Sequence, residues 1–452
     1  MSRLILLASA ASYRAGDFEK AAKRLGIDIV LGMDVPAPLA HTYHCDLPLD
    51  YLDVEKSARA IATYAESNPV GAILSADDSA TVLAARASQR LGLRHNSPEA
   101  AEAARDKYTM RQFFERAGIP SPKFRLYSLD SDPEDVVDDL GTLINTDETQ
   151  INADDLDLIN QTNLRSSDQI SVYPRSPSSQ PLAYPVVLKP RRLSGSRGVI
   201  RADDPIQFMA AYNRLRPILE KTGADDFLVE EFIPGVEVAL EGMLDNGVLK
   251  VLALFDKPDP LDGPYFEETI YVTPSRLPET TQQAIIDCAA RAAAALGLRN
   301  GPVHAELRVN ESGPVMVELA GRSIGGLCSR TLQFGTEMSL EELVLRQTFG
   351  LEIESAQREG QAGGVMMIPI PRGGTFLGCD GVEEAKAVPG IESIEITAKV
   401  NYPILPLPEG ESYLGFIFAR GTTPEEVEAV LRESHRQLRF EIVLEITVLP
   451  VR

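Results

Sequence analysis

Residues 185–202 read PVVLKPRRLSGSRGVIRA: an apolar run that ends in Lys189, a loop rich in Ser, Gly and Arg, and a second apolar run. Two short apolar runs around such a loop predict a β-hairpin whose tip is a flap. Glycine and serine let backbone N–H groups approach a phosphate, and the arginines add countercharge. No GxxxxGK[ST] pattern precedes a helix, so the loop is not a P-loop. Taken alone, it could equally be an exposed basic turn.

The whole chain of 452 residues has 44 Lys and Arg against 66 Asp and Glu, a net charge of −22. This length predicts about three domains. Because so acidic a chain repels phosphate backbones and anionic lipids, nucleic acid and membrane are poor partners. No run approaches the ~18 apolar residues of a membrane span. The four cysteines form no CxxC pair, so we expect reduced thiols in a cytoplasmic protein.

The first hundred residues alternate apolar runs such as LILLAS, IDIVLG and VGAILSA with helical patterns. This alternation predicts an α/β domain with a doubly wound parallel sheet over residues 1–105. The opening MSRLILLAS is interpreted as its first strand and not as a signal peptide, because its apolar core is too short. The loop after it lacks GxGxxG, so no dinucleotide site is expected.

A linker helix and a lid are predicted over 106–235, interrupted by an acidic insertion at 128–183. Between Leu129 and Asn160 the chain has eleven acidic residues and no Lys or Arg. Such one-signed charge with low hydrophobicity predicts a largely disordered insertion. Only its start, PEDVVDDLG, has the pattern of a short helix.

Downstream, the stretch FLVEEFIPGVEVALEGMLDNGVLKVLALFDK predicts three antiparallel strands, with a tight turn at Asn246-Gly247. We expect an antiparallel-sheet core over 236–350 and an α+β domain over 351–452. The chain has no internal repeat.

The hairpin VHAELRVNESGPVMVELAGR brings two carboxylates together. A five-residue loop starting at Asn310 places Glu306 directly opposite Glu318, with His304 and Arg308 on the same face. Like charges directly opposite destabilise a sheet, so this pair indicates a cation between them. Hard oxygen ligands without a His-Cys cluster favour Mg²⁺ shared with substrate phosphates. A solvated strand face is the alternative.

These motifs occur in the order ARDKYTMR, VVLKP, SGSRGV, VEEFIPGVEV, HAELR and VELAGR, and together they resemble the ATP-grasp superfamily over roughly residues 1–350. The segments VGAILSADDSATVLAARASQRLGL and RDKYTMRQFFERAGIPSP, with the form of the last domain, resemble the L-amino-acid ligase branch, which makes dipeptides. The resemblance implies an ATP-grasp fold: a parallel-sheet N-terminal domain, a mobile lid, an antiparallel-sheet catalytic domain and a C-terminal α+β domain.

The resemblance also implies the nucleotide site. Lys107 and Lys189 would reach the phosphates, where an ammonium needs no further partner. Backbone groups of Glu230 and Ile233 would hold the adenine, and Glu237 would accept from the ribose hydroxyls. Each charged residue could instead be a surface or strand-end side chain. The other residues expected to bind the nucleotide are Ser194, Gly195, Ser196, Arg197, Gly198 and Glu231.

Glu306 and Glu318 match the family's metal ligands, which hold two Mg²⁺ ions, with Mn²⁺ as a substitute. Many members carry Asn two residues after the second Glu as a further ligand, and here that position is Ala320. This departure leaves one metal less well held. Arg322 matches the arginine that contacts the transferring phosphate or the developing oxyanion.

The remaining expectations concern catalysis and substrate. Arg322 and the backbone of Gly325 and Gly326 are candidate oxyanion donors. His304 would orient a substrate carboxylate or act as a base, and a structural role is its alternative. Glu267 or Glu268, in PYFEETIYVTP, is a candidate partner for a substrate ammonium, or else both are solvent-facing lid charges.

The expected reaction is ATP-dependent: a carboxylate becomes an acyl phosphate, and an amine displaces phosphate to form an amide, releasing ADP and phosphate. Two rivals remain open, a biotin-carboxylase-like enzyme that activates bicarbonate and a non-catalytic ATP-binding scaffold, which Ala320 would favour. The expected partners are small molecules, and a homodimer is left open.

Overall fold

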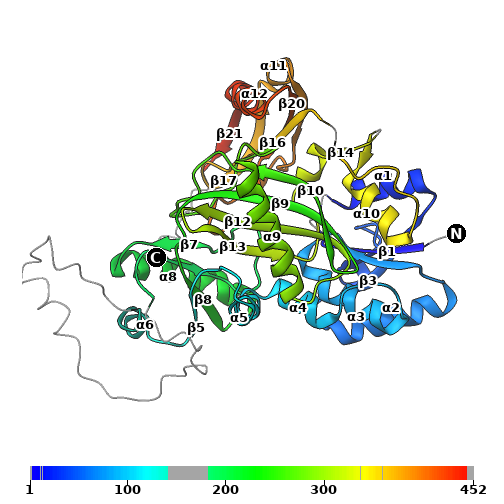
Figure 1. The fold of residues 1–452 in the computed structure, drawn as a ribbon, viewed down its shortest axis with the longest axis horizontal. Helices are drawn as coiled ribbons and strands as arrows, with labels where there is room; N and C mark the ends of the chain where they lie inside the picture. Colours follow the sequence, from blue (N-terminus) through cyan, green and yellow to red (C-terminus); the bar gives the residue numbers. More distant parts are fainter. Residues whose placement is uncertain are drawn as a thin grey trace, which may run out of the picture.

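The computed structural model describes residues 3–10, 12, 14–140, 182–335, 337–358 and 360–444. Figure 1 shows a large central sheet, with the N-terminal domain on one side of it, the lid on another and the C-terminal elements above. In this described part of the chain, no helix combines the length and apolar character needed to span a membrane. The acidic insertion lies mostly outside the described residues.

The N-terminal domain holds a four-stranded sheet in the order β3-β2-β1-β4, with every strand parallel to its neighbours. The predicted α/β class is confirmed. Its strands are β1 (Arg3–Ala8), β2 (Asp28–Asp34), β3 (Leu47–Leu49) and β4 (Ala72–Ser75), and its helices are α1 (Ala15–Leu25), α2 (Val54–Ser67), α3 (Thr81–Leu91) and α4 (Pro98–Arg105).

Helix α5 (Lys107–Ala117) leads into the lid, a four-stranded antiparallel sheet in the order β5-β8-β6-β7. The opening hairpin PVVLKPRRLSGSRGVIRA forms β6 and β7, as predicted. A short helix at PEDVVDDLG is also confirmed. The lid elements are β5 (Phe124–Ser128), α6 (Pro133–Asp139), β6 (Val186–Lys189), β7 (Ile200–Ala202), α8 (Pro205–Thr222) and β8 (Asp226–Glu231).

The central sheet has eight strands in the order β13-β12-β9-β10-β11-β16-β20-β18. Helix α9 (Glu279–Ala295) covers its β9, β12 and β13 end through Ile285, Cys288 and buried alanines. The first five strands are β9 (Val236–Asp245), β10 (Val248–Asp256), β11 (Ile270–Thr273), β12 (Gly301–Asn310) and β13 (Gly313–Ala320).

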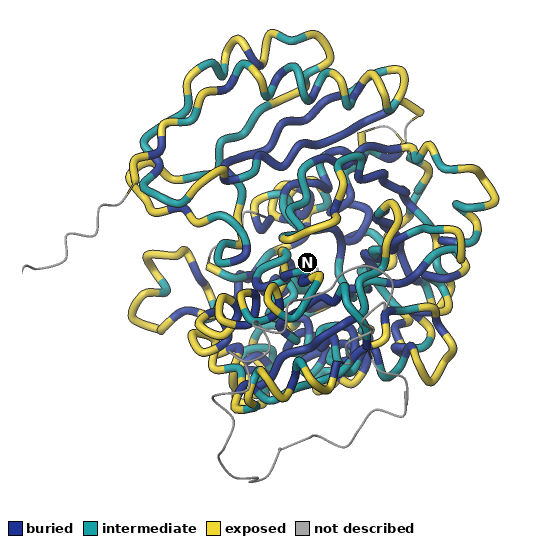
Figure 2. The backbone as a smooth tube through the Cα atoms, turned by 90° about the vertical axis from the view of Figure 1, so that its left-hand side faces the viewer, coloured by how far each residue is buried: buried dark blue, intermediate teal, exposed yellow. Residues whose placement is uncertain are grey.

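The other three strands of the central sheet come from beyond residue 350, so the sheet continues across the predicted start of the last domain. β16 and β20 are mostly buried, whereas the edge strand β18 is partly exposed, and Figure 2 shows buried strands beneath exposed turns in this part of the molecule. The elements that follow β13 are η3 (Cys328–Thr331), β14 (Gln333–Phe334), β15 (Met338–Ser339), α10 (Leu340–Phe349), β16 (Ala362–Ile368), β17 (Gly374–Asp380), α11 (Val382–Lys386), β18 (Ile391–Ile396), β19 (Tyr402–Ile404), β20 (Gly415–Gly421), α12 (Pro424–Gln437) and β21 (Arg439–Val443).

Three antiparallel strands were predicted over FLVEEFIPGVEVALEGMLDNGVLKVLALFDK. β9 and β10 do pair in this way, but β8, which falls in the predicted lid segment 106–235, pairs with β5 and β6. The chain turns at Gly235, where φ is +123° and a Cβ would lie 2.2 Å from the carbonyl oxygen of Val309. Glycine is needed there, and this turn separates the lid sheet from the central sheet. The predicted turn at Asn246-Gly247 does join β9 and β10.

Candidate active site

A cavity of about 520 Å³ lies where the lid, the central sheet, the N-terminal domain and residues 411–413 meet. Small-molecule sites commonly have volumes of roughly 300–1,000 Å³. Most of the residues predicted for the site line this one cavity. They are Lys107, Lys189, Ser194, Gly195, Ser196, Glu231, Ile233, Glu237, Glu268, His304, Glu306, Glu318, Arg322, Gly325 and Gly326.

Glu306 on β12 lies opposite Glu318 on β13, as the sequence predicted. The predicted five-residue loop is wrong, because the turn is tighter and Asn310 pairs with Gly313. A bulge at Val317 compensates by inserting one extra residue into β13. Without this bulge Glu306 would face Val317, and Glu318 would point to the other face of the sheet.

A buried lysine that the sequence analysis missed lies beside Glu306. The Lys257 ammonium is 3.2 Å from Glu306 and 2.7 Å from Glu237, and it also bonds Glu268. Its side chain is 2% exposed. Burial lowers the pKa of Lys257, but the three carboxylates outweigh burial and raise the pKa well above its ordinary value. The cluster is therefore a fixed charge network in the cavity wall.

A sequence signal for Lys257 existed. It ends an apolar strand and precedes proline in LFDKP, the same arrangement that marked Lys189 in VVLKP. The second occurrence was not weighed, and the two lysines lie on the wall of one cavity or directly behind it.

His304 lies between two carboxylates, with Nδ1 3.2 Å from Glu241 and Nε2 3.5 Å from Glu306. Burial lowers the pKa of His304, but these neighbours outweigh burial and raise the pKa to about 9. The ring is therefore protonated at neutral pH. Burial also raises the pKa of Glu306, yet Lys257 and His304 hold it well below its ordinary value. Glu306 is ionised, as a metal ligand must be.

Two lysines face the cavity from the lid side. Lys107 starts α5, and its ammonium donates to the carbonyl of Leu193 at 2.8 Å and lies 3.4 Å from Glu318. Lys189 ends β6, and its ammonium lies 2.7 Å from Glu230. Both side chains are nearly buried, so each charge is held in the wall and neither is a surface lysine.

The hinge between lid and core lies at one end of the cavity. Glu231, Ile233 and Glu237 line it, as expected for residues around an adenosine. Glu230 does not. Its backbone lies inside the lid sheet between β5 and β6, and its fully buried carboxylate bonds Lys189. The expectation that a Glu230 backbone group holds the adenine is therefore corrected.

The Ser-Gly loop divides its residues between two tasks. Ser194, Gly195 and Ser196 line the cavity. Arg197 instead lies 3.3 Å from Glu411, and the Gly198 N–H donates to the carbonyl of Pro408 at 2.9 Å. The expectation that Arg197 and Gly198 bind phosphate is corrected in this conformation, in which they hold the loop against the C-terminal part.

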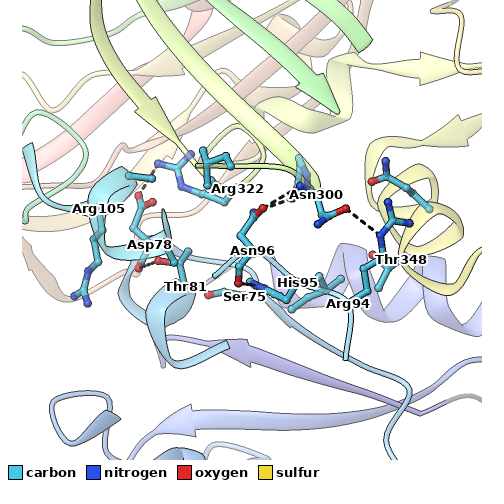
Figure 3. Close-up of a pocket in the computed structure, with 18 residues that line it drawn as sticks. Ser75, Asp78, Thr81, Arg94, His95, Asn96, Arg105, Asn300, Arg322 and Thr348 are labelled. Carbon is cyan, nitrogen blue, oxygen red and sulfur yellow. Dashed lines mark hydrogen bonds and ion pairs between the residues drawn. The ribbon is translucent and has the colours of Figure 1, made fainter. Parts of the chain in front are cut away.

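Arg322 follows β13 and bonds Asp78 at 2.6 Å and the carbonyl of Ser323 at 2.9 Å. Burial raises the pKa of Asp78, but Arg322 outweighs it and lowers the pKa below the ordinary value. Figure 3 shows this pair from a smaller cavity of about 60 Å³ behind it, between the N-terminal domain and β12. The pair therefore forms part of the wall between the two cavities.

Glu268 lines the cavity next to Tyr271, whose hydroxyl donates to it at 2.8 Å. Burial raises the pKa of Glu268 to about 7, although Lys257 acts in the opposite direction. Glu268 is thus not a solvent-facing charge. Because its pKa lies near neutral pH, a cation that binds beside it would shift its protonation.

The N-terminal domain supplies cavity residues that the sequence analysis missed. Ser9 and Ser12 follow β1, and Asp77 follows β4 and accepts from both serines. Strand β1 lies between β2 and β4. The strands β2 and β3 follow on one side of β1, and β4 lies on its other side, so the strand order reverses at β1. Ligands commonly bind in the crevice at the carboxyl ends of strands where this order reverses. This rule could have identified the ends of β1 and β4 as part of the site. The cavity residues from this domain are Ser9, Ser12, Arg14, Ala76, Asp77, Asp78 and Ser79.

Three family models match the chain. An ATP-grasp N-terminal domain covers residues 18–95, an ATP-grasp domain covers 182–331, and an L-amino acid ligase C-terminal domain 2 covers 366–443. The chain therefore belongs to the ATP-grasp superfamily, whose members bind ATP. Within that superfamily, the third model is that of the L-amino acid ligases, and the relatives that the chain resembles include proteins named as ligases.

Among the relatives, the alanine–anticapsin ligase of Bacillus subtilis is 28% identical over 53% of this chain. The chain spans about half the length of that relative, 46%. An L-amino acid ligase from Bacillus licheniformis has a similar structure, with a TM-score of 0.75, 24% identity, and coverage of 98% of this chain and 99% of that one. A carboxyaminoimidazole ribonucleotide synthase from Aspergillus clavatus, solved with ATP, has a TM-score of 0.67, 16% identity, and coverage of 96% and 98%.

Proposed function

We propose that this protein joins a carboxylate to an amine at the expense of ATP, forming a dipeptide-like amide through an acyl phosphate and releasing ADP and phosphate. One observation carries the proposal. Glu306 and Glu318 lie opposite each other in a cavity that also holds Lys107, Lys189 and Arg322. Opposed carboxylates among fixed cations suit a polyphosphate with its divalent ions.

The carboxylates fit Mg²⁺. Glu306 and Glu318 present hard oxygen ligands, and each lies 3.2–3.4 Å from a lysine ammonium, which marks a place for positive charge. Ala320, opposite His304, adds no ligand. Magnesium bound here would neutralise charge on the transferring phosphoryl group. We propose Glu306 and Glu318 as its protein ligands.

In the first step, a substrate carboxylate attacks the γ-phosphorus of ATP. Phosphoryl transfer depends mainly on positioning and on neutralising charge. Lys107 and Lys189 would bind the phosphates, and the Ser194–Ser196 loop would cover them with backbone N–H groups. Arg322, held by Asp78, would face the transferred group.

In the second step, the amine attacks the acyl phosphate and displaces phosphate. An acyl phosphate hydrolyses in water, so the lid must exclude solvent. The tetrahedral oxyanion would meet Arg322 and the backbone N–H groups of Gly325 and Gly326. Glu241 steadies that loop by accepting the Ile324 N–H at 3.0 Å.

The cavity also suggests how an amino acid would be oriented. His304, protonated at neutral pH, suits the role of orienting a carboxylate better than that of a base. Glu268 would receive a substrate ammonium, whose charge would lower the carboxyl pKa again. His304 Nε2 lies 3.5 Å from the same Glu306 oxygen that the Lys257 ammonium contacts at 3.2 Å, and Lys257 also bonds Glu268.

Product analysis tests the proposal. The purified protein is given Mg-ATP with each amino acid in turn, singly and in pairs, and separately with bicarbonate. ADP and phosphate that form only with particular amino acids, together with a dipeptide, support the proposal. AMP and pyrophosphate would contradict it, bicarbonate dependence would favour the carboxylase, and ATP binding without turnover would favour the scaffold.

A variant pair sharpens this test. Glu318→Gln removes a proposed metal ligand and should lower turnover by at least about 100-fold, since outer and inner metal partners commonly contribute 10–100-fold or more. Glu311→Gln, on the exposed turn of the same hairpin, is the matched control and should keep wild-type turnover. Equal turnover in Glu318→Gln and wild type would contradict the assignment.

A further inference from the structure

Arg111 is a fully buried arginine that none of the steps above uses. It lies in the second turn of α5, one turn after Lys107, and its exposed fraction is 0%. Burying a guanidinium is costly unless partners satisfy it. Its partners should therefore reveal what the residue does.

The first partner is Glu230. Arg111 Nε lies 2.7 Å from one oxygen of Glu230, and the other oxygen accepts from Arg111 Nη2 at 3.1 Å and lies 2.7 Å from the Lys189 ammonium. The three charges form a buried triad in the order Arg111, Glu230, Lys189. Burial raises the pKa of Glu230, but Arg111 and Lys189 outweigh burial and keep it below its ordinary value. The single carboxylate is thus shared by two cations.

The second partner is the carbonyl oxygen of Val317, to which Arg111 Nη2 donates at 2.6 Å. Val317 is the bulge residue of β13 that sets Glu318 opposite Glu306. A donor directed at the carbonyl of an extra, unpaired residue helps to hold a bulge in place. One guanidinium therefore touches both the lid strand β8 and the catalytic strand β13.

The remaining neighbours complete the picture. Lys107, on the same helix, lies 3.4 Å from Glu318. Lys189 projects into the cavity from β6, which pairs with β8. Three groups that the proposed function assigns to phosphates and metal are thus linked to Arg111 through Glu230, through Val317 or along α5.

We propose that Arg111 is a positioning residue for the nucleotide's polyphosphate. It shares the negative charge of Glu230, so that Lys189 is free to turn toward phosphate. It also holds the bulge that places Glu318 opposite Glu306. The inference rests on the proposed function, because it assumes that a polyphosphate occupies the cavity. Arg111 itself does not line the cavity and touches no substrate.

The sharing of Glu230 has a direct consequence. Without Arg111, Glu230 would be neutralised by Lys189 alone, in a buried site where a lone carboxylate is costly. Lys189 would then be retained by Glu230 and would meet the phosphates less well. Removing the charge of Glu230 as well should release Lys189 again.

The experiment measures binding of ATP and of adenosine by calorimetry, in wild type and in Arg111→Met. We expect the variant to bind ATP about 10–100-fold more weakly, the usual cost of losing a residue that orients a ligand-binding side chain. Adenosine has no phosphates, so its affinity should change much less. The ratio of the two affinities is the readout that separates positioning from general damage.

Three further variants guard against misfolding. Phe114→Leu alters the fully buried core of the same helix and is the control for lost stability, matched by melting temperature. Arg111→Lys keeps the charge and should recover part of the ATP affinity. The double variant Arg111→Met/Glu230→Gln should bind ATP more tightly than Arg111→Met, because Lys189 is released.

The outcomes are distinguishable. Unchanged ATP affinity in Arg111→Met, an equal loss for ATP and adenosine, or the same affinity ratio in Phe114→Leu at matched stability would each overturn the positioning role while leaving the proposed function intact. A wild-type protein that binds no ATP would overturn both, since Lys189 would then have no phosphate to meet. If Arg111→Met does not fold, Arg111→Lys carries the same test of the affinity ratio.

Discussion

At the scale of single residues, Lys257 offsets part of the negative charge of the candidate site. Its ammonium contacts Glu237, Glu268 and Glu306, each of which has a carboxylate oxygen within 4.8 Å of one from the others. Three carboxylates this close would repel one another strongly without a cation. The arrangement explains how the cavity can hold so many acidic groups before any ligand binds.

Lys257→Met should lower the free energy of unfolding by about 3–5 kcal/mol, the cost of removing one partner of a buried charge group. Urea denaturation measures it. Lys250→Met, on the exposed face of the same strand β10, is the control and should change stability little. A Lys257→Met protein as stable as wild type would show that the network does not support the fold.

At this scale the sequence predicted the paired carboxylates well. Side chains along a strand point alternately to its two faces, and this alternation in β12 and β13 places Glu306 and Glu318 on one face. It could not predict that a tighter turn and a bulge at Val317 compensate each other, because both depend on the Arg111 and Pro120 contacts with β13. Lys257 was missed because a strand-end lysine is usually a surface residue.

At the scale of elements, the start of α5 depends on one aspartate. Asp106 is the N-cap and accepts from the Thr109 N–H at 2.9 Å, and it also bonds Arg191 and Arg192. Burial raises the pKa of Asp106, but these partners outweigh burial and lower it below the ordinary value. They tie the lid loop to the helix that carries Lys107.

Asp106→Asn should keep the cap but lose the ion pairs, costing about 2 kcal/mol near neutral pH. Because the folded pKa lies below the unfolded value of about 3.9, this stability is present above about pH 4 and is lost as pH falls through the folded pKa. Thermal melts across acidic pH check this. Asp53→Asn, at the exposed N-cap of α2, is the control. Identical acid sensitivity in Asp106→Asn and wild type would contradict the role.

Most elements could be predicted from alternating and helical patterns, whereas their partners could not. That β8 pairs with β5 and β6 and not with β9 could not be predicted from VEEFIPGVEV, because its apolar pattern has no break except Gly235. The need for glycine there comes from the approach of Val309, a contact between residues more than 70 positions apart. Local patterns carry no information about such an approach.

At the scale of the whole molecule, the lid is held by the C-terminal part. Arg197 lies 3.3 Å from Glu411, and Arg214 bonds both oxygens of Glu409 at 2.6 and 2.9 Å. Glu411 itself lines the cavity. The two ion pairs connect the lid to the C-terminal part like a latch, and no sequence motif predicted them.

Glu409→Gln/Glu411→Gln should therefore speed nucleotide release. Exposed ion pairs are each worth at most about 1 kcal/mol, so we expect about a two- to tenfold faster rate. Salt should speed release from the wild type and affect the variant less. Stopped-flow release of a fluorescent nucleotide measures both. Glu220→Gln, which breaks an ion pair with Arg216 on the same lid helix, is the control. Equal release rates would contradict a latch.

At this scale the fold class could be predicted, because the order of the motifs is read directly from the sequence. The continuity of the central sheet beyond residue 350 could not, since it depends on β11 pairing with β16, two strands about 90 positions apart. The division into domains stays a prediction.

The central claim is that a carboxylate oxygen attacks the γ-phosphorus. It is tested most directly by supplying an amino acid substrate labelled with ¹⁸O in its carboxylate, together with Mg-ATP and an amine, and by analysing the released phosphate by mass spectrometry. An acyl phosphate transfers one carboxylate oxygen to phosphate, because the bond from that oxygen to carbon breaks when the amine attacks. The account predicts one ¹⁸O in each phosphate released. Unlabelled phosphate, or label found in AMP, would contradict it.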